Sequence, residues 1–154
     1  MKIEIDDLTR PAIHALLEEH LRNMNALGPP ESVHALDLAE LRRPEITFGS
    51  AWDDGVLLGC GALLALGGRH GEVKSMRTPE ARRRTGAGRA LLTHIIAVAQ
   101  ARGYERLSLE TGSVAAFVPA HRLYERAGFV RSGPFGDYVE DVNSVFMTLA
   151  LPLR

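Results

Sequence analysis

The loop at residues 82–88, Arg-Arg-Arg-Thr-Gly-Ala-Gly, has a composition suited to binding an anion. Glycines that open a helix let backbone N–H groups converge on an anion, and the helix dipole favours negative charge at that end. Thr85 adds a hydroxyl donor, and the neighbouring arginines add positive charge. Because each such contact contributes only about 0.3–1 kcal/mol at an exposed site, several must act together. The loop predicts a site for a phosphate-bearing ligand, and a solvated arginine run at a helix start is the alternative.

Two common phosphate-binding motifs do not fit this loop. A P-loop requires a lysine directly after a glycine, and the only lysines, Lys2 and Lys74, lack that context. The dinucleotide fingerprint requires a third glycine where this chain has Leu91. The sequence therefore excludes a Walker motif and argues against a Rossmann domain.

Hydrophobic periodicity places the basic loop between a strand and a helix. A strand candidate at residues 72–77 ends at Pro79, and apolar residues at helical spacing mark a helix after the loop that Gly103 closes. A second strand and helix follow, with the strand at residues 106–110 and the helix ending before Gly128. The loop is thus expected to connect the first strand and helix pair.

The rest of the chain also alternates between strand and helix patterns. Ile3 and Ile5 alternate with polar residues, as in a half-buried strand, and Pro11 marks a helix start. Asp53-Asp54-Gly55 predicts the turn of a hairpin. The other expected elements are a loop at 25–30, a short helix at 36–41, hairpin strands at 46–52 and 56–66, and strands at 129–130 and 145–151.

Composition restricts the protein class. With 154 residues, 45% of them hydrophobic, we expect one domain spanning residues 1–154. Eighteen basic and 19 acidic residues argue against a general nucleic-acid or anionic-membrane binder. Cys60 is the one cysteine and is expected to be buried, and no Cys/His spacing suggests a metal site. The acidic N-terminus is unlike a signal peptide, so a cytoplasmic protein is expected.

The basic loop and a later segment together resemble the GCN5-related N-acetyltransferase (GNAT) superfamily. Residues 83–88 match the family's acetyl-CoA signature, which is Arg or Gln, then two residues, Gly, one residue, and Gly or Ala. The segment Leu-Tyr-Glu-Arg-Ala-Gly-Phe at residues 123–129 is also typical of the family. The element order matches from end to end, and residues 29–52 and 135–147 resemble a small bacterial branch. The resemblance implies an α/β GNAT fold with a mixed, mostly antiparallel central sheet, flanking helices and two splayed central strands.

The same resemblance implies a reaction and a cofactor site. The reaction is direct transfer of an acetyl group from the cosubstrate acetyl-CoA to a primary amine. The pyrophosphate would bind the loop backbone, the pantetheine arm would lie along the preceding strand, and the second helix would border that arm. The implied cofactor-binding residues are Met76, Arg77, Thr78, Arg83, Arg84, Thr85, Gly86, Ala87, Gly88, Arg89, Phe117, Ala120 and His121.

Three side chains are candidates for proton transfer. Tyr124 stands where many family members protonate the departing thiolate, and a phenol with a pKa of about 10 is protonated at neutral pH. An amine acceptor must lose a proton before it attacks. Glu72 is the first candidate base, at the position of the catalytic glutamate in related histone acetyltransferases, and Glu110 is the second, with Thr111 and Ser113 able to hold a water. Each of these side chains could instead be structural or solvated, and His121 is expected at the surface.

The resemblance also locates the acceptor pocket at residues 25–34 and 135–138. Three acidic residues could attract a cationic amine and three aromatic residues could form walls. These residues are Asp137, Glu140, Asp141, Phe135, Tyr138 and Trp52. The acidic residues could instead serve solubility, and Trp52 could equally be a core residue.

Near-neutral charge and a short chain favour a small-molecule amine as the acceptor. A protein N-terminus or lysine is an alternative acceptor, and a non-catalytic acyl-CoA sensor is an alternative function. Homodimers are frequent in the family, so a homodimer is an open alternative.

Overall fold

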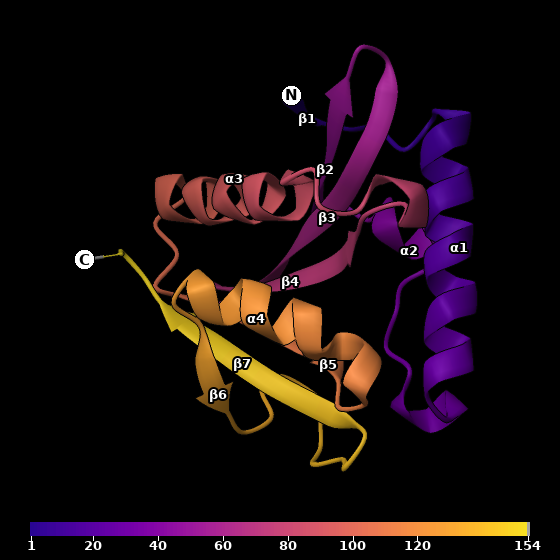
Figure 1. The fold of residues 1–154 in the computed structure, drawn as a ribbon. Helices are drawn as coiled ribbons and strands as arrows, with labels where there is room; N and C mark the ends of the chain where they lie inside the picture. The colour runs from indigo at the N-terminus through magenta and orange to yellow at the C-terminus, as the bar shows by residue number, and fades with distance from the viewer. Residues whose placement is uncertain (154) are drawn as a thin grey trace.

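The computed structural model describes residues 1–153, and its centre is a seven-stranded sheet with strand order β1-β2-β3-β4-β5-β7-β6 (Figure 1). All neighbouring strands are antiparallel except β4 and β5, which are parallel. The predicted mixed, mostly antiparallel sheet is therefore confirmed. The strands are β1 (Lys2–Ile5), β2 (Ile46–Asp53), β3 (Val56–Gly67), β4 (His70–Arg77), β5 (Arg106–Gly112), β6 (Val130–Ser132) and β7 (Ser144–Ala150).

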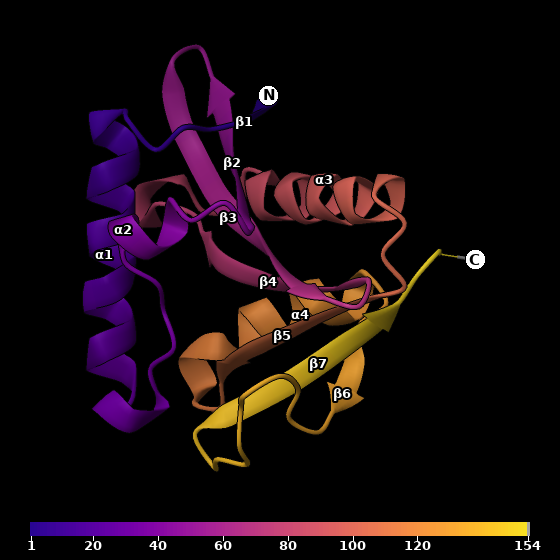
Figure 2. The ribbon, with the colours of Figure 1, turned by 180° about the vertical axis from the view of Figure 1, so that it is seen from behind.

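Helices cover both faces of the sheet. Figures 1 and 2 together show α3 and α4 on one face and α1 with α2 on the other. Apolar residues recur at helical spacing on α1 and α3 and are buried against the sheet, which is why these segments form amphipathic helices. The helices are α1 (Pro11–Leu27), α2 (Leu38–Leu41), α3 (Ala87–Ala101) and α4 (Val118–Arg126), with 3-10 turns η1 (Pro30–Ser32), η2 (Glu80–Arg82) and η3 (Ala115–Phe117).

The two central strands separate after a short paired stretch. Strands β4 and β5 pair only from His70 opposite Arg106 to Glu72 opposite Ser108. Beyond Glu72 the strands continue without pairing to each other, which leaves backbone groups of both strands free along a wedge. The expected splay of the central strands is confirmed.

Strand β4 is also irregular on its other side, where it pairs with β3. Cys60 lies opposite Arg77 while Ala62 lies opposite Lys74, so β4 carries an extra residue in this stretch. Ser75 has a φ of 55°, a left-handed conformation suited to a bulge. A bulge bends the strand that carries it, and this one lies in the part of β4 that no longer pairs with β5.

Two sequence expectations need adjustment at the N-terminal end. Helix α1 extends to Leu27, into the predicted loop at 25–30, and Ile5 is 66% exposed because β1 is an edge strand paired only with β2. Cys60 is fully buried, as predicted. Among the described residues, none of the helices has the length and apolar character needed to cross a membrane.

Candidate functional site

The basic loop forms the start of α3. Arg84 and Gly86 both have left-handed backbone conformations, with φ of 66° and 84°. Such a turn directs successive N–H groups toward one side, as in other anion-binding loops. The Thr85 hydroxyl accepts a 3.3 Å hydrogen bond from the Ala87 N–H, but no side chain caps the helix at Gly86. The first turn of α3 therefore retains donors for a ligand.

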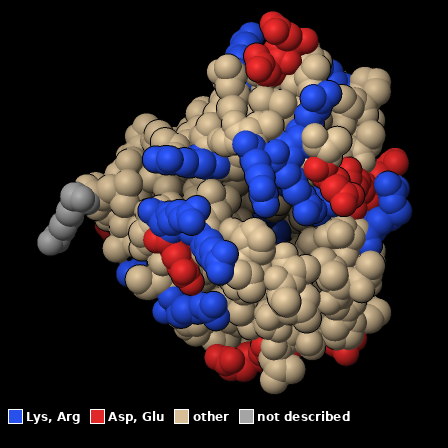
Figure 3. All heavy atoms as spheres, viewed as in Figure 1, with Lys and Arg blue, Asp and Glu red and all other residues tan. Residues whose placement is uncertain are grey.

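Positive charge surrounds this turn. The side chains of Arg82, Arg83, Arg84 and Arg89 are exposed. Figure 3 shows Lys and Arg atoms gathered over the start of α3, at the edge of a hollow that opens toward α4. Free backbone donors, a helix N-terminus and exposed guanidinium groups fit the pyrophosphate of a CoA thioester.

Helix α4 and the turn before it close against the free end of β5. The Phe117 ring lies where a Cβ on Gly112 would stand. The His121 Nε2 lies 2.8 Å from the Gly112 carbonyl oxygen, and this side chain is only 6% exposed. The expectation of a surface His121 is wrong because this bond draws the imidazole onto β5.

Tyr124 lies on the buried side of α4. Its ring meets Phe129 edge-on at 5.8 Å between centroids, and burial raises the pKa of its hydroxyl above the ordinary value. A Cβ on Gly88 would contact Leu123 at 3.5 Å, so the basic loop and this part of α4 are neighbours. The phenol stays protonated at neutral pH, and it directly follows Leu123, the residue that contacts the start of α3.

The strand residues predicted along the cofactor divide between the two sheet faces. Met76 packs toward α3 and Thr78 follows the strand, whereas the Arg77 guanidinium donates to Glu19 at 2.8 Å and Asn23 at 3.1 Å on α1. Arg77 could thus contact a cofactor only through its main chain.

A closed triangle of hydrogen bonds lies at the fork between β4 and β5. The Tyr138 hydroxyl donates to Glu72 Oε2 at 2.6 Å, and Lys74 Nζ donates to the same oxygen at 3.1 Å and to the Tyr138 hydroxyl oxygen at 2.9 Å. Glu72 is 3% exposed. Burial, the Glu72 charge and this hydrogen bond raise the pKa of Tyr138 well above its usual range. Tyr138 is therefore a proton donor to Glu72 at any physiological pH.

A second carboxylate lies further along the wedge. Glu110 lies two positions after Ser108, the last β5 residue that pairs with β4. Its carboxylate accepts a 2.7 Å hydrogen bond from the Ser144 hydroxyl. Burial raises the pKa of Glu110, an effect that the Ser144 hydrogen bond opposes and the Glu72 charge increases. A partly buried carboxylate with a raised pKa is a suitable proton acceptor near neutral pH.

Aromatic side chains cover this face of the wedge. Tyr138 contacts His34, Phe135 and Phe146, with ring centroids 4.9, 5.0 and 5.6 Å apart. Ser32 donates a hydrogen bond to Asp141, which ties the segment after α1 to the segment before β7. The two segments predicted to build the acceptor pocket are therefore in contact.

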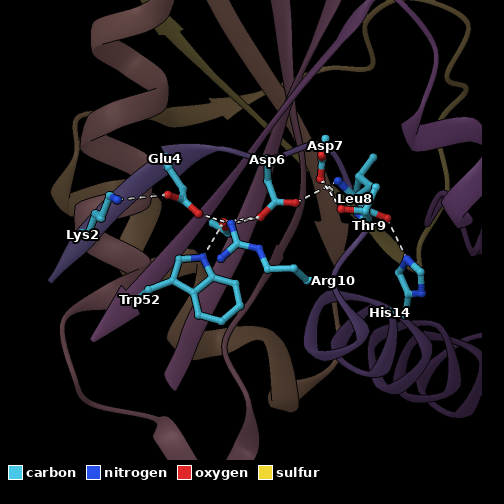
Figure 4. Close-up of polar contacts among 10 residues, drawn as sticks. Lys2, Glu4, Asp6, Asp7, Leu8, Thr9, Arg10, His14 and Trp52 are labelled. Atoms are coloured by element: carbon cyan, nitrogen blue, oxygen red, sulfur yellow. Dashed lines mark hydrogen bonds and ion pairs between the residues drawn. The ribbon is translucent and has the colours of Figure 1, made fainter. Parts of the chain in front are cut away.

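Trp52 lies elsewhere in the fold. Figure 4 shows its ring against the Arg10 guanidinium, 4.1 Å from the ring centroid, while Arg10 pairs with Glu4 and Asp6. The indole N–H donates to Ser50, which lies two residues earlier on β2. Of the two interpretations of Trp52, the structure supports the packing residue and not the pocket wall, because Trp52 packs against a hydrophobic cluster and its cation–π contact holds it near β1.

The acidic residues predicted near the acceptor pocket, Asp137, Glu140 and Asp141, do not supply the carboxylates of the site. Asp141 is engaged by Ser32 and by the Asn143 N–H, and the Ser32 hydrogen bond holds its pKa below the usual value. Asp137 and Glu140 are exposed and form no ion pair in the described part of the chain. The carboxylates that face the aromatic cluster are Glu72 and Glu110.

Neighbours of Glu110 also differ from expectation. The Ser113 hydroxyl donates to the Val142 carbonyl at 2.8 Å, and the direct partner of Glu110 is the Ser144 hydroxyl. Sequence reasoning missed Lys74 and Ser144, whereas His34 belongs to the predicted segment 25–34. For Lys74 a signal existed, since it alternates with Glu72 on one strand face and is one of only two lysines.

Sequence comparison gives an extensive match to a family of known chemistry. The model of the Acetyltransferase (GNAT) family matches residues 13–129. The N-acetyltransferase YsnE of Bacillus subtilis, whose activity is uncharacterized, is 58% identical over 98% of this chain and all of that protein. YedL of Escherichia coli, also an uncharacterized N-acetyltransferase, is 48% identical over 97% of this chain and 94% of that protein. An IAA acetyltransferase of Azospirillum brasilense is 42% identical over 88% of both chains.

Solved structures share the fold. A Klebsiella pneumoniae protein, provisionally described as an acyl-CoA N-acyltransferase, superposes with a TM-score of 0.82 at 27% identity, over 97% of both chains. A Bacillus subtilis acetyltransferase solved in complex with CoA superposes with a TM-score of 0.67 at 19% identity, over 98% of this chain and 99% of that chain. At the latter identity the likeness concerns the fold alone.

Proposed function

The chain belongs to the acetyltransferase (GNAT) family, and from this premise we propose that it acetylates the primary amine of a small molecule. It is an acyl-CoA-dependent acyltransferase with acetyl-CoA as cosubstrate. The observation that carries the proposal is the wedge between β4 and β5, which has an anion-binding loop at one mouth and two carboxylates under aromatic rings on the opposite face. We also propose that residues 1–154 act as one domain, because one sheet includes strands from both ends of the chain.

The donor side of the proposed site consists of the loop and α4. The left-handed turn at Arg84 and Gly86 would direct N–H groups to the pyrophosphate, and nearby guanidinium groups would add charge. Phe117, Ala120 and His121 would border the pantetheine arm beside the free edge of β4. When bound, acetyl-CoA supplies an activated thioester whose carbonyl oxygen a free strand N–H can polarise.

On the acceptor side, the contacts favour Glu110 over Glu72 as the base for an external amine. The Glu72 carboxylate already holds the Lys74 ammonium and the Tyr138 hydroxyl on one oxygen. Glu110 has one hydroxyl partner and a pKa raised by burial, so it accepts a proton more readily. We infer that Glu110 deprotonates the acceptor and that Glu72 holds the pocket wall.

Tyr124 is the proposed acid for the leaving thiolate. Its hydroxyl is protonated at neutral pH because burial raises its pKa. A Tyr124→Phe variant should keep its CoA affinity and lose turnover. Full turnover in this variant would remove the acid role.

The shape and charge of the acceptor side support a small acceptor. The contact between Ser32 and Asp141 joins the two segments that border the pocket, and rings of Phe135 and Tyr138 cover the carboxylates. An extended protein segment would need a more open surface. A sensor without turnover would not need two carboxylates and a protonated phenol at the wedge.

The test is thiol release from acetyl-CoA across polyamines, amino acids, aminoglycosides and arylamines, with calorimetry of CoA binding in parallel. Turnover with one amine class supports the proposal and identifies the acceptor. Tight CoA binding without turnover of any small amine would favour a protein acceptor or a sensor. Absence of CoA binding would contradict the assignment of the loop.

A further inference from the structure

Lys74 places a primary amine inside the proposed acceptor site. Its side chain is 9% exposed, and its Nζ lies 3.1 Å from a Glu72 carboxylate oxygen. The chain has only one other lysine, Lys2, whose side chain is 77% exposed at the edge strand β1. Apart from the N-terminal amine, these are the only two amines on which the enzyme could act within its own chain.

The backbone puts Lys74 within the wedge. The last residue of β4 that pairs with β5 is Glu72, so Lys74 lies two positions into the separated stretch and on the same strand face. Ser75, the next residue, begins the left-handed bulge at the mouth of the wedge. An amine at this position is held close to the strand edge along which an acyl thioester would lie.

We propose that Lys74 is an internal acceptor, which the enzyme acetylates when no external amine is present. This inference rests on the proposed function, because it uses the same wedge and the same donor. An amine held beside a carboxylate needs no diffusional encounter, which is the usual advantage of an intramolecular acceptor.

The proton balance uses groups already in place. The Lys74 ammonium gives one proton to Glu72, and the neutral Nζ forms a bond to the acetyl carbonyl carbon. The carbon–sulfur bond breaks with its electron pair on the CoA sulfur, and Nζ loses its second proton to water as the amide forms. Tyr124 protonates the thiolate and is reprotonated by water, and Glu72 releases its proton to solvent.

Acetylation of Lys74 would change the acceptor side. The amide has no positive charge, so the 3.1 Å ion pair with Glu72 disappears and the buried carboxylate loses its only cationic partner among the described residues. The added acyl group would also occupy space next to the aromatic cluster. The modified enzyme is expected to turn over external amines more slowly, so acetylation limits activity when acceptor is scarce.

The experiment incubates the full chain with acetyl-CoA in the absence of amine, followed by intact mass and peptide mapping. We expect one acetyl group, on Lys74, formed about tenfold or more faster than on Lys2. Exposure alone would give the opposite order, so Lys2 is the internal control for non-enzymatic acetylation. Adding an amine that supports turnover should slow the modification of Lys74.

Two variants and one denatured control complete the test. Lys74→Arg keeps the positive charge and should not gain the acetyl group. Glu72→Gln should slow the modification of Lys74. In the unfolded chain, acetyl-CoA should modify both lysines at similar rates. Acetylation of Lys2 at the same rate as Lys74, or an unmodified Lys74 in an enzyme that turns over an external amine, would overturn the inference and leave the proposed function intact. Loss of CoA binding would overturn both.

Discussion

The Tyr138 hydroxyl donates a 2.6 Å hydrogen bond to the Glu72 carboxylate, which joins the segment before β7 to the last residue of β4 that pairs with β5. Because Glu72 is 3% exposed, its charge depends on partners within the protein. Only Tyr138 and Lys74 donate to it among the described residues. The acceptor wall and the fork of the sheet are thus stabilised by the same contact.

Tyr138→Phe removes this hydrogen bond without changing the ring. A hydrogen bond to a charged group contributes about 1.5–3 kcal/mol, so the free energy of unfolding should fall by about that amount. The KM for the amine should rise, since Tyr138 also forms the pocket wall. Urea unfolding and steady-state kinetics measure the two effects. The control is Tyr104→Phe, whose ring packs against the core, and equal stability of both variants would contradict the prediction.

Glu110→Gln tests the general base. A base must be deprotonated, so kcat/KM of the wild type should fall as pH decreases through the raised pKa of Glu110. The pH profile of the Glu110→Gln variant should lack this acidic limb, and its rate should be about 10²-fold or more lower. Ser144→Ala removes the hydrogen bond that lowers this pKa, so it should move the limb to higher pH. Glu105→Gln, an exposed carboxylate paired with Arg69, is the control. If Glu72→Gln rather than Glu110→Gln removes the limb, Glu72 is the base.

Much of the fold could be predicted because its signals are local. The hairpin strands predicted at 46–52 and 56–66 match β2 and β3 within one residue at each end. Both the strand patterns and the Asp53-Asp54-Gly55 turn are determined by residues close together in the sequence. The turn before α3 also has a local signal, because its left-handed backbone conformation favours glycine at Gly86, which has a φ of 84°.

The acceptor side could be predicted only in part because its contacts are long-range. Tyr138 and Glu72 are 66 positions apart, and no local pattern fixes how the segment before β7 returns to the fork. Trp52 shows the same limit, since its partner Arg10 belongs to the start of α1. His121 was misplaced because its partner is a backbone carbonyl, which the sequence does not distinguish.

Gly86→Ala tests the turn at the start of α3. No atom lies within 4 Å of the added Cβ, so the cost comes from the left-handed conformation and should be about 1–2 kcal/mol of stability. Relaxation of the turn would redirect its N–H groups, so CoA affinity in calorimetry should fall as well. Gly133→Ala is a matched control, with an equally open Cβ position and no positive φ. Unchanged CoA affinity in Gly86→Ala would contradict the role of this turn.

His20 is a buried, uncharged imidazole on the inner side of α1. It is 7% exposed, and its Nδ1 has no hydrogen-bond partner among residues 1–153. Burial, assisted by the nearby Arg77 charge, lowers the pKa of His20 from 6.5 to about 4. Charging this side chain therefore opposes folding.

The folded pKa of His20 lies below its unfolded value, so the unfolded chain binds the proton first as pH falls. Stability from this group is complete above pH 6.5 and is lost progressively toward pH 4, by up to about 3 kcal/mol. His20→Gln cannot titrate, so its unfolding free energy should decline less steeply than that of the wild type over this interval. Urea unfolding at several pH values measures the slopes, with His94→Gln on α3 as the control. Parallel curves for wild type and His20→Gln would show that His20 does not cause the loss.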